Sequence, residues 1–207
     1  MRLLFFLSIT FFPYAFYFPE FGGSYYQMTD ENEIIPLIRE NAEKGFRLLM
    51  AKYKEPVYWH IRRLVVSHAD AQDATQDTFL RIFRSFSQYS GEGSFKAWIF
   101  RIATNEALRL LARNQGKTTL SLDETPLVAL TMAADSYFDF GNAEAVRLQK
   151  AITALPAKQQ LAFNLRYYDE LSYKEIADVA GSTEATVKAN YHFAKEKIIK
   201  YMNSNDI

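Results

Sequence analysis

Three carboxylates stand at helical spacing in the segment DAQDATQD, close after a histidine. Asp70, Asp73 and Asp77 are three and four residues apart, so a helix would carry them on one face. Carboxylate oxygens suit magnesium or calcium, and His68 stands two residues before the first of them. However, an EF-hand calcium loop needs a glycine turn, whereas the apolar residues here keep helical spacing. The pattern therefore favours a solvated or partner-facing acidic surface over a metal site.

A second group of residues combines aromatic and basic side chains in the segment FKAWIFRIATNEALRLLAR. Its helix-spaced apolar residues are Phe95, Trp98, Ile99 and Ile102. The polar residues on its other faces are Lys96, Arg101, Asn105 and Arg109. Bases stack on aromatic rings while cations contact phosphates, so such a surface could hold single-stranded nucleic acid. A core helix with solvated charges has the same pattern, and the segment taken alone favours that interpretation.

A third group lies in LSYKEIADVAGSTEATVKANYHFAKEKI, which spans residues 171–198 and predicts two short helices joined by a tight turn. Ser172 and Glu175 fit a capping box, in which a serine oxygen caps the helix start and a glutamate reaches back. Gly181 takes a positive φ without steric cost, so it can end the first helix and turn the chain. These signals indicate where the first helix begins and ends.

The second helix of this pair would bury one stripe and leave the opposite side polar. Either Ser182 or Thr183 can cap its start. Its apolar residues recur at helical spacing, and they are Val187, Tyr191, Ala194 and Ile198. A helix-turn-helix lays its second helix in the DNA major groove, but many helical hairpins with this pattern touch no nucleic acid. On this segment alone both interpretations stay open.

The composition limits the class of protein. With 207 residues, 49% hydrophobic and 15% aromatic, the chain can bury real cores. The absence of cysteine excludes disulfides and thiolate metal sites, and it fits a reducing cytoplasm. A formal net charge of zero means that any nucleic-acid contact must use local patches or DNA shared with a more basic partner.

Catalytic signatures do not appear in the sequence. The glycine-bearing loop at residues 88–94 is not followed by the Gly-Lys-Ser/Thr of a phosphate loop, and no nucleophile elbow or metal-histidine pair is found. His60 and His192 are isolated, so we expect surface or partly buried residues rather than ligands or bases. The sequence therefore predicts a protein that is not an enzyme, with no cofactor, no bound metal and no small-molecule substrate.

Helical apolar spacing runs almost throughout the chain from Glu31, with a break expected at Pro56 and a helix N-cap expected at Asp70. Pro156 suits a first-turn position of a later helix. Residues 114–141 are rich in Thr, Ser, Asp and Gly, which predicts a flexible acidic linker. We therefore expect an all-α chain with one small helical domain at 28–113, a second at 142–207 and the helix-turn-helix in the second.

Residues 1–27 differ from the rest. Their apolar run is too short to span a bilayer, and no clear small-x-small cleavage site follows it. Met28 opens a conventional start with acidic residues before a helix. We expect a start codon placed too early and a leader that is unstructured or absent, with a membrane anchor as the minority alternative.

Four blocks, spread over roughly residues 42–199, together resemble the bacterial RNA polymerase sigma factors of the extracytoplasmic-function (ECF) group, in the sigma-70 family. The first two resemble the opening and the core-binding helix of region two, and they are KGFRLLMAKYKEPVYWHIRRLV and DAQDATQDTFLRIFRSF. The third, GEGSFKAWIFRIATNEALRLLAR, resembles the DNA-melting part of region two. The fourth resembles region four and is LPAKQQLAFNLRYYDELSYKEIADVAGSTEATVKANYHFAKEKI.

The resemblance implies three sets of contact residues. Those implied to dock on the clamp helices of RNA polymerase core are Asp70, Asp73, Asp77, Phe79, Arg81 and Arg84. Those implied to open the minus-ten element and hold its non-template strand are Phe95, Lys96, Trp98, Arg101 and Asn105. Those implied to contact the minus-thirty-five duplex are Ser172, Tyr173, Ser182, Thr183, Thr186, Lys188, Ala189, His192 and Lys195.

The resemblance also implies partners and a place of action. The implied function is transcription initiation at promoters, with RNA polymerase core and promoter DNA as partners. The implied location is the cytoplasm. An anti-sigma factor would inhibit the protein, and contact with a membrane would occur only through that factor. The main alternative is a stand-alone helix-turn-helix regulator, which would bind DNA without polymerase. Where the family often carries arginines, this chain has Asn190 and Phe193, which leaves the promoter sequence unpredicted. The low basic charge predicts poor DNA binding by the free protein.

Overall fold

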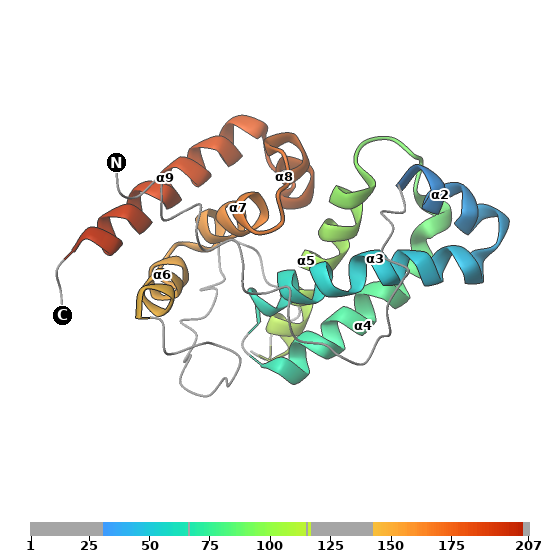
Figure 1. Cartoon of the computed structure of the whole chain (residues 1–207), viewed down its shortest axis with the longest axis horizontal. Helices are drawn as coiled ribbons and strands as arrows, with labels where there is room; N and C mark the ends of the chain where they lie inside the picture. Colours follow the sequence, from blue (N-terminus) through green and yellow to red (C-terminus); the bar gives the residue numbers. More distant parts are fainter. Residues whose placement is uncertain (1–30, 66, 115, 117–142, 205–207) are drawn as a thin grey trace.

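Every regular element is helical in the residues that the computed structural model describes, which are 31–65, 67–114, 116 and 143–204 (Figure 1). The first group of helices is α2 (Glu31–Glu40), α3 (Ala42–Arg62), α4 (His68–Ser85), the short 3-10 helix η1 (Phe86–Gln88) and α5 (Phe95–Asn114). The second group is α6 (Ala143–Thr153), α7 (Ala157–Tyr167), α8 (Tyr173–Ala180) and α9 (Glu184–Asn203). The all-α prediction is confirmed, while the expected leader and nearly all of the expected linker lie outside the described residues.

Two local predictions for the first group were wrong. Pro56 lies inside α3 and does not end it. Tyr53 and Val57, on either side of the proline, are both buried on the core side, and this packing holds the helix together where the proline removes one hydrogen bond. The N-cap of α4 is Ser67, whose hydroxyl accepts a hydrogen bond from the Asp70 N–H, so Asp70 lies in the first turn.

The caps of the second group follow the sequence closely. Ser172 and Glu175 form both hydrogen bonds of a capping box at the start of α8. Gly181 ends α8 in the left-handed conformation, with φ 59° and ψ 41°. Thr183, one of the two candidates, is the N-cap of α9. Pro156 is the residue just before α7 rather than a member of its first turn.

The two groups of helices are packed against each other. One continuous core contains Ile61 of α3 and Phe100 of α5 together with Leu165 of α7 and Ile176 of α8. Helices α5 and α8 make the main contact between the groups, and Figure 1 shows α7 and α8 beside the first group. A smaller core of α6, α7 and α9 belongs to the second group alone. The halves that the sequence places on a flexible tether are therefore in contact in this structure.

Glycine at position 45 permits a close approach between α2 and α3. A Cβ placed on Gly45 would lie 2.5 Å from the Ile38 N atom and 2.6 Å from its Cα, closer than real Cβ contacts. Ile38 is itself buried, and both atoms belong to the backbone of α2, so a side chain at position 45 would push the helices apart. Glycine lowers helix stability, so its place inside α3 indicates that packing outweighs propensity.

We expect Gly45→Ala to lower the free energy of unfolding by about 1–3 kcal/mol, because overpacking outweighs the gain in helix propensity. Thermal and urea unfolding followed by circular dichroism measure this. Lys44→Ala, at an exposed neighbouring position of the same helix, is the matched control and should have little effect. A Gly45→Ala protein as stable as the original would contradict the close packing of α2 on α3.

Candidate nucleic-acid interface

The helix-turn-helix of α8 and α9 is held by local caps and one buried stripe. Thr183 Oγ1 accepts a hydrogen bond from the Thr186 N–H at 3.2 Å, which fixes the start of α9. Val187, Ala194 and Ile198 are buried and Tyr191 is partly buried, so these residues turn one side of α9 toward the domain. The opposite side is left open along the first three turns of the helix.

The residues predicted to contact the duplex lie on this open side or at its rim. Eight are exposed, and they are Ser172, Ser182, Thr183, Thr186, Lys188, Ala189, His192 and Lys195, while Tyr173 is partly buried. Lys188 pairs with Glu184 at 2.7 Å, and its ammonium also lies over the Tyr173 ring. The Ser172 hydroxyl is used in the capping box. The predicted residues thus lie from the start of α8 to the middle of α9, with exposed or partly exposed side chains.

A large aromatic residue on the open side of α9 was not among the predicted contacts. Phe193 is 50% exposed although it is a large apolar side chain, and it follows Thr186 and Ala189 at helical spacing on the open side. An exposed aromatic ring here has few neighbours to pack on, so it suits an apolar contact such as the methyl group of thymine. The signal in the sequence was the place of Phe193 outside the buried stripe.

Three of the five α5 residues predicted to contact the melted DNA strand share one side of the helix. Trp98, Arg101 and Asn105 are spaced by three and four residues, so they share one side of the helix. Arg101 and Asn105 are exposed, and Trp98 is partly buried. The Trp98 ring is stacked on Phe95, with 5.8 Å between centroids, and lies 5.2 Å from Tyr89. This surface offers an aromatic ring held in place, a cation and an amide.

The other two predicted contacts on α5 must be corrected. Phe95 is only 2% exposed and packs among Tyr53, Phe86 and Tyr89, so it supports Trp98 from the core and offers no surface of its own. Lys96 turns to a different side of α5, where its Nζ donates a hydrogen bond of 2.5 Å to the Asp169 carbonyl oxygen of the second domain. Neither residue is available to a strand in this arrangement.

The predicted acidic face of α4 is present, with changes. Asp73 and Asp77 are exposed, as is Arg84, whereas Asp70 is partly buried and accepts a hydrogen bond from the Asn114 amide. Phe79 is buried at 7% exposure, so it belongs to the core and its predicted place on the docking surface is wrong. Arg81 forms an ion pair with the buried carboxylate of Glu106, which ties α4 to α5.

An apolar surface lies beside the acidic residues of α4. Phe83 is 58% exposed and Leu80 is 49% exposed, and both follow Asp73 and Asp77 along α4. The Phe83 ring meets Phe46 of α3 edge-on at 4.8 Å, and Met50, one turn after Phe46, is also exposed. We call Phe46, Met50, Leu80 and Phe83 the α3–α4 apolar patch. Exposed apolar side chains grouped in this way are typical of a protein-binding surface.

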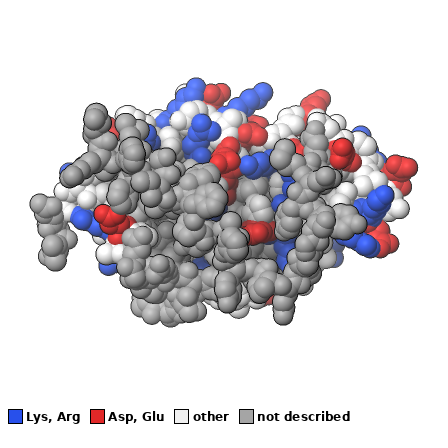
Figure 2. All heavy atoms as spheres, in the orientation of Figure 1, with Lys and Arg blue, Asp and Glu red and all other residues white. Residues whose placement is uncertain are grey.

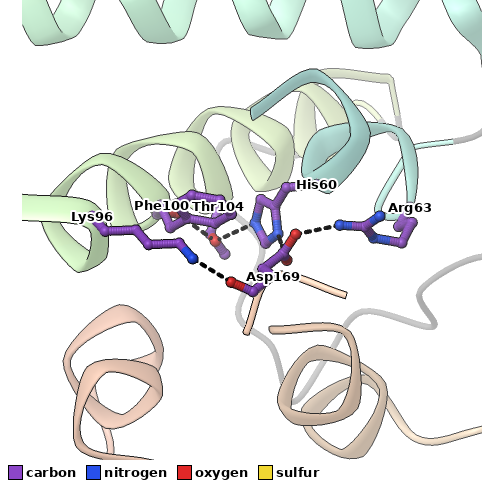
Figure 3. A network of polar contacts seen from close by, with 6 residues as sticks. All are labelled: His60, Arg63, Lys96, Phe100, Thr104 and Asp169. Atoms are coloured by element: carbon purple, nitrogen blue, oxygen red, sulfur yellow. Dashed lines mark hydrogen bonds and ion pairs between the residues drawn. The ribbon is translucent and has the colours of Figure 1, made fainter. Parts of the chain in front are cut away.

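A buried histidine resembles part of a catalytic triad but cannot act as one. His60 Nδ1 lies 2.9 Å from Asp169 Oδ2, and His60 Nε2 lies 2.9 Å from Thr104 Oγ1 (Figure 3). However, His60 is 0% exposed and Thr104 is 2% exposed, so no substrate reaches the hydroxyl. The Thr104 hydroxyl also donates to the Phe100 carbonyl oxygen. The sequence-based expectation of an isolated, partly exposed His60 was wrong.

A second polar contact joins the two groups of helices near the same place. The Ser94 hydroxyl, just before α5, donates a hydrogen bond of 2.6 Å to Glu175 of α8. Burial raises the pKa of Glu175, but hydrogen bonds from Ser94 and Ser172 and the charge of Lys96 outweigh burial and hold it below its ordinary value. The ionised carboxylate therefore contributes stability at neutral pH, and the contribution is lost as the pH falls through the lowered pKa.

Sites for small ligands are not prominent in the described part of the chain. No group of three or more His, Cys, Asp or Glu residues there could hold a metal ion. A hollow of about 100 Å³ lies where α7, α8 and α9 meet, next to Gly181 and Ser182, and it is smaller than the usual ligand pocket. On the described part of the face drawn in Figure 2, Lys and Arg side chains lie among Asp and Glu side chains. No described helix is long and apolar enough to cross a membrane.

Comparison with known proteins gives two matches to family models and several relatives. The model of Sigma-70 region 2 matches residues 49–117, and the model of Sigma-70, region 4 matches residues 145–198. The chain is 29% identical over 181 residues to the ECF RNA polymerase sigma-E factor of Escherichia coli (strain K12), covering 83% of this chain and 93% of that protein. It is also 29% identical to the RNA polymerase sigma-H factor of Pseudomonas aeruginosa, covering 82% and 92%.

Two solved structures share the fold. The complex of CnrH with the cytosolic domain of CnrY matches with a TM-score of 0.62 at 18% identity, covering 84% of this chain and 97% of the other. The complex of the sigma factor RpoE with the anti-sigma factor NepR from Bartonella quintana matches with a TM-score of 0.61 at 21% identity, covering 78% and 99%. At these identities the likeness concerns the fold.

We expect Val187→Asp to unfold the second group of helices, because the charge would enter a site that is 2% exposed and holds no partner for it. The cost is on the order of several kcal/mol. Thermal unfolding of the purified protein measures this, with Ala185→Asp on the exposed side of the same helix as the control. An unchanged melting temperature for Val187→Asp would show that the buried side of α9 is misassigned.

Proposed function

Since the chain belongs to the extracytoplasmic-function group of the sigma-70 family, it binds RNA polymerase core and directs transcription initiation at promoters, and we propose which of its surfaces make each contact. The observation that carries the assignment is the presence, in order, of region 2 and region 4 in one all-helical chain. A stand-alone helix-turn-helix regulator is not favoured, because region 2 accounts for the first half. Sigma factors are initiation factors rather than catalysts.

The polymerase contact is proposed at the exposed side of α4. Asp73 and Asp77 supply negative charge there, Leu80 and Phe83 supply exposed apolar area, and Arg84 lies one turn beyond. An apolar centre with charged residues at its rim is the usual composition of a protein interface. In this proposal the apolar patch provides most of the binding free energy, and the acidic residues set orientation and partner choice.

The melted minus-ten strand is proposed to lie on α5. Trp98 offers a ring for base stacking, Arg101 reaches phosphate, and Asn105 can donate to and accept from a base edge. Because Phe95 and Tyr89 hold the Trp98 ring from behind, the stacking surface is set before DNA arrives. Lys96 joins this surface only if its contact with the second domain breaks.

The minus-thirty-five duplex is proposed to meet the open side of α9. Thr183 and Thr186 stand at the helix start, where base edges and phosphates are reachable, and Lys188 and Lys195 flank the helix. Phe193 would add an apolar contact with thymine methyl groups in place of the arginine contact with guanine. This set binds duplex DNA weakly by itself, since the charge of the whole chain is balanced.

We also propose that the protein acts in the cytoplasm and that an anti-sigma factor holds it inactive. The support comes from the two solved structures with a similar fold. CnrH was solved in complex with the cytosolic domain of CnrY, and RpoE was solved in complex with the anti-sigma factor NepR. An anti-sigma factor that covers the α3–α4 apolar patch would exclude polymerase from the same surface.

The function is tested by transcription in vitro with sigma-free polymerase core and a genomic library of the host as template. We expect transcripts with discrete start sites that depend on the added protein and share elements near minus-ten and minus-thirty-five. A parallel gel shift without polymerase should show only weak duplex binding at physiological salt. Tight, specific binding of the free protein, with no transcript from core that depends on the added protein, would instead favour the stand-alone regulator.

We expect the double change Asp73→Lys with Asp77→Lys to leave the fold intact and to weaken the association with core, because both side chains are exposed and have no structural task in α4. Co-purification with core and thermal unfolding measure the two effects. Glu40→Lys with Glu55→Lys changes the net charge equally at exposed positions of α2 and α3 and serves as the control. If both double variants recover the same amount of core, then Asp73 and Asp77 do not take part in docking.

A further inference from the structure

Asp169 joins the two halves of the chain from a turn between α7 and α8. Its side chain is 3% exposed, although a carboxylate is costly to bury without partners. It accepts a hydrogen bond from Arg63 in an ion pair and faces His60, both of the first half (Figure 3). Both of these partners lie in the first half, whereas the backbone N–H of Asp169 donates to the Asn164 carbonyl oxygen of its own half. The protein partners of the carboxylate thus come from the other half, and it keeps them only while the halves are in contact.

The turn that presents Asp169 is strained. Glu170, the next residue, has φ 57°, the one positive φ of a non-glycine residue in the described ranges. L-residues seldom adopt this conformation, and it persists only where the surroundings impose it. The Leu171 N–H donates to the Leu165 carbonyl oxygen and Arg166 donates to the Leu171 carbonyl oxygen, so the second half alone fixes this turn. Asp169 is therefore held ready to enter the first half.

The residues around this contact lie on the same helices as the proposed DNA surfaces or next to them. Lys96 and Ser94 lie at the start of α5, where the melted strand is proposed to pass, and they bond to Asp169 and Glu175. Glu175 also forms the capping box of α8, the first helix of the helix-turn-helix. The contact between the halves therefore occupies polar groups at the edges of both surfaces.

The distance between the promoter elements excludes this arrangement during promoter binding. Elements at minus-ten and minus-thirty-five are about 25 base pairs apart, which is about 85 Å of duplex at about 3.4 Å per pair. A compact body of the size described here has a radius of gyration of about 15 Å. Surfaces on α5 and α9 cannot reach both elements while the halves share one core.

We propose that Asp169 is an intramolecular latch, which keeps the free protein closed and has to leave the Arg63–His60 site before both promoter elements are engaged. The proposal rests on the proposed function, because it assigns the closed form to the protein without polymerase. In the closed form Lys96 is withheld from DNA and the halves are held too close together for the promoter. Binding to polymerase then has to supply the free energy that separates them.

The latch is tested by measuring the distance between the halves in the free protein. Because the chain has no native cysteine, cysteines introduced at the exposed positions Glu92 and Lys174 carry two nitroxide labels and no others. Double electron–electron resonance should give one short, narrow distance for this protein. Asp169→Asn should replace it with longer, broader distances, and Asp178→Asn on the exposed side of α8 should leave it unchanged.

A second variant separates loss of the latch from loss of folding. Arg63→Met removes the cation from the opposite half, and it should broaden the distance in the same way while circular dichroism stays that of the folded protein. A short, narrow distance retained in both Asp169→Asn and Arg63→Met would overturn the proposal. So would a broad distance in the starting protein.

The same labelled proteins show separately whether the latch proposal or the proposed function fails. Adding polymerase core and promoter DNA should lengthen the distance of the starting protein. If the starting protein is closed and Asp169→Asn opens it, but neither supports transcription with core, then the proposed function fails and the latch stands. If both support transcription and their distances are equal, the latch fails and the function stands.

Discussion

Helix α5 packs against α3, α4 and α8 at once, and this threefold packing governs what the rest of the protein can do. It buries side chains on several faces, from Phe95 at its start to Ala112 near its end. The side of α5 that stays open includes the strip of Trp98, Arg101 and Asn105. The same packing places Lys96 against the second half, so one helix both carries a proposed DNA surface and holds the halves together.

Local chemistry allowed much of the second half to be predicted from the sequence. The capping box at Ser172, the left-handed Gly181 and the buried stripe through Val187 each depend on residues close in sequence. Because a short helix-turn-helix is determined almost wholly by such signals, its exposed contact residues could be named correctly as surface. The same periodicity places Phe193 outside the buried stripe.

Features that depend on distant residues could not be predicted. Apolar spacing shows that a side of a helix is buried but does not show against what, so Phe79 and Phe95 were placed on surfaces although both are buried. The Asp169 carboxylate meets a histidine 109 positions earlier in the chain, and no local pattern links them. Pro56 remained in a helix because tertiary packing outweighed a local breaker.

The α3–α4 apolar patch also affects the lifetime of the free protein in the cell. Solvent-exposed Phe83 and Leu80 are features by which chaperones and proteases recognise immature proteins, and by which identical chains adhere to one another. A polymerase or an inhibitor seated there would shield the chain from both fates. We therefore expect cellular turnover to follow the supply of partners, so that surplus copies are cleared and the amount of this protein is matched to the machinery it serves.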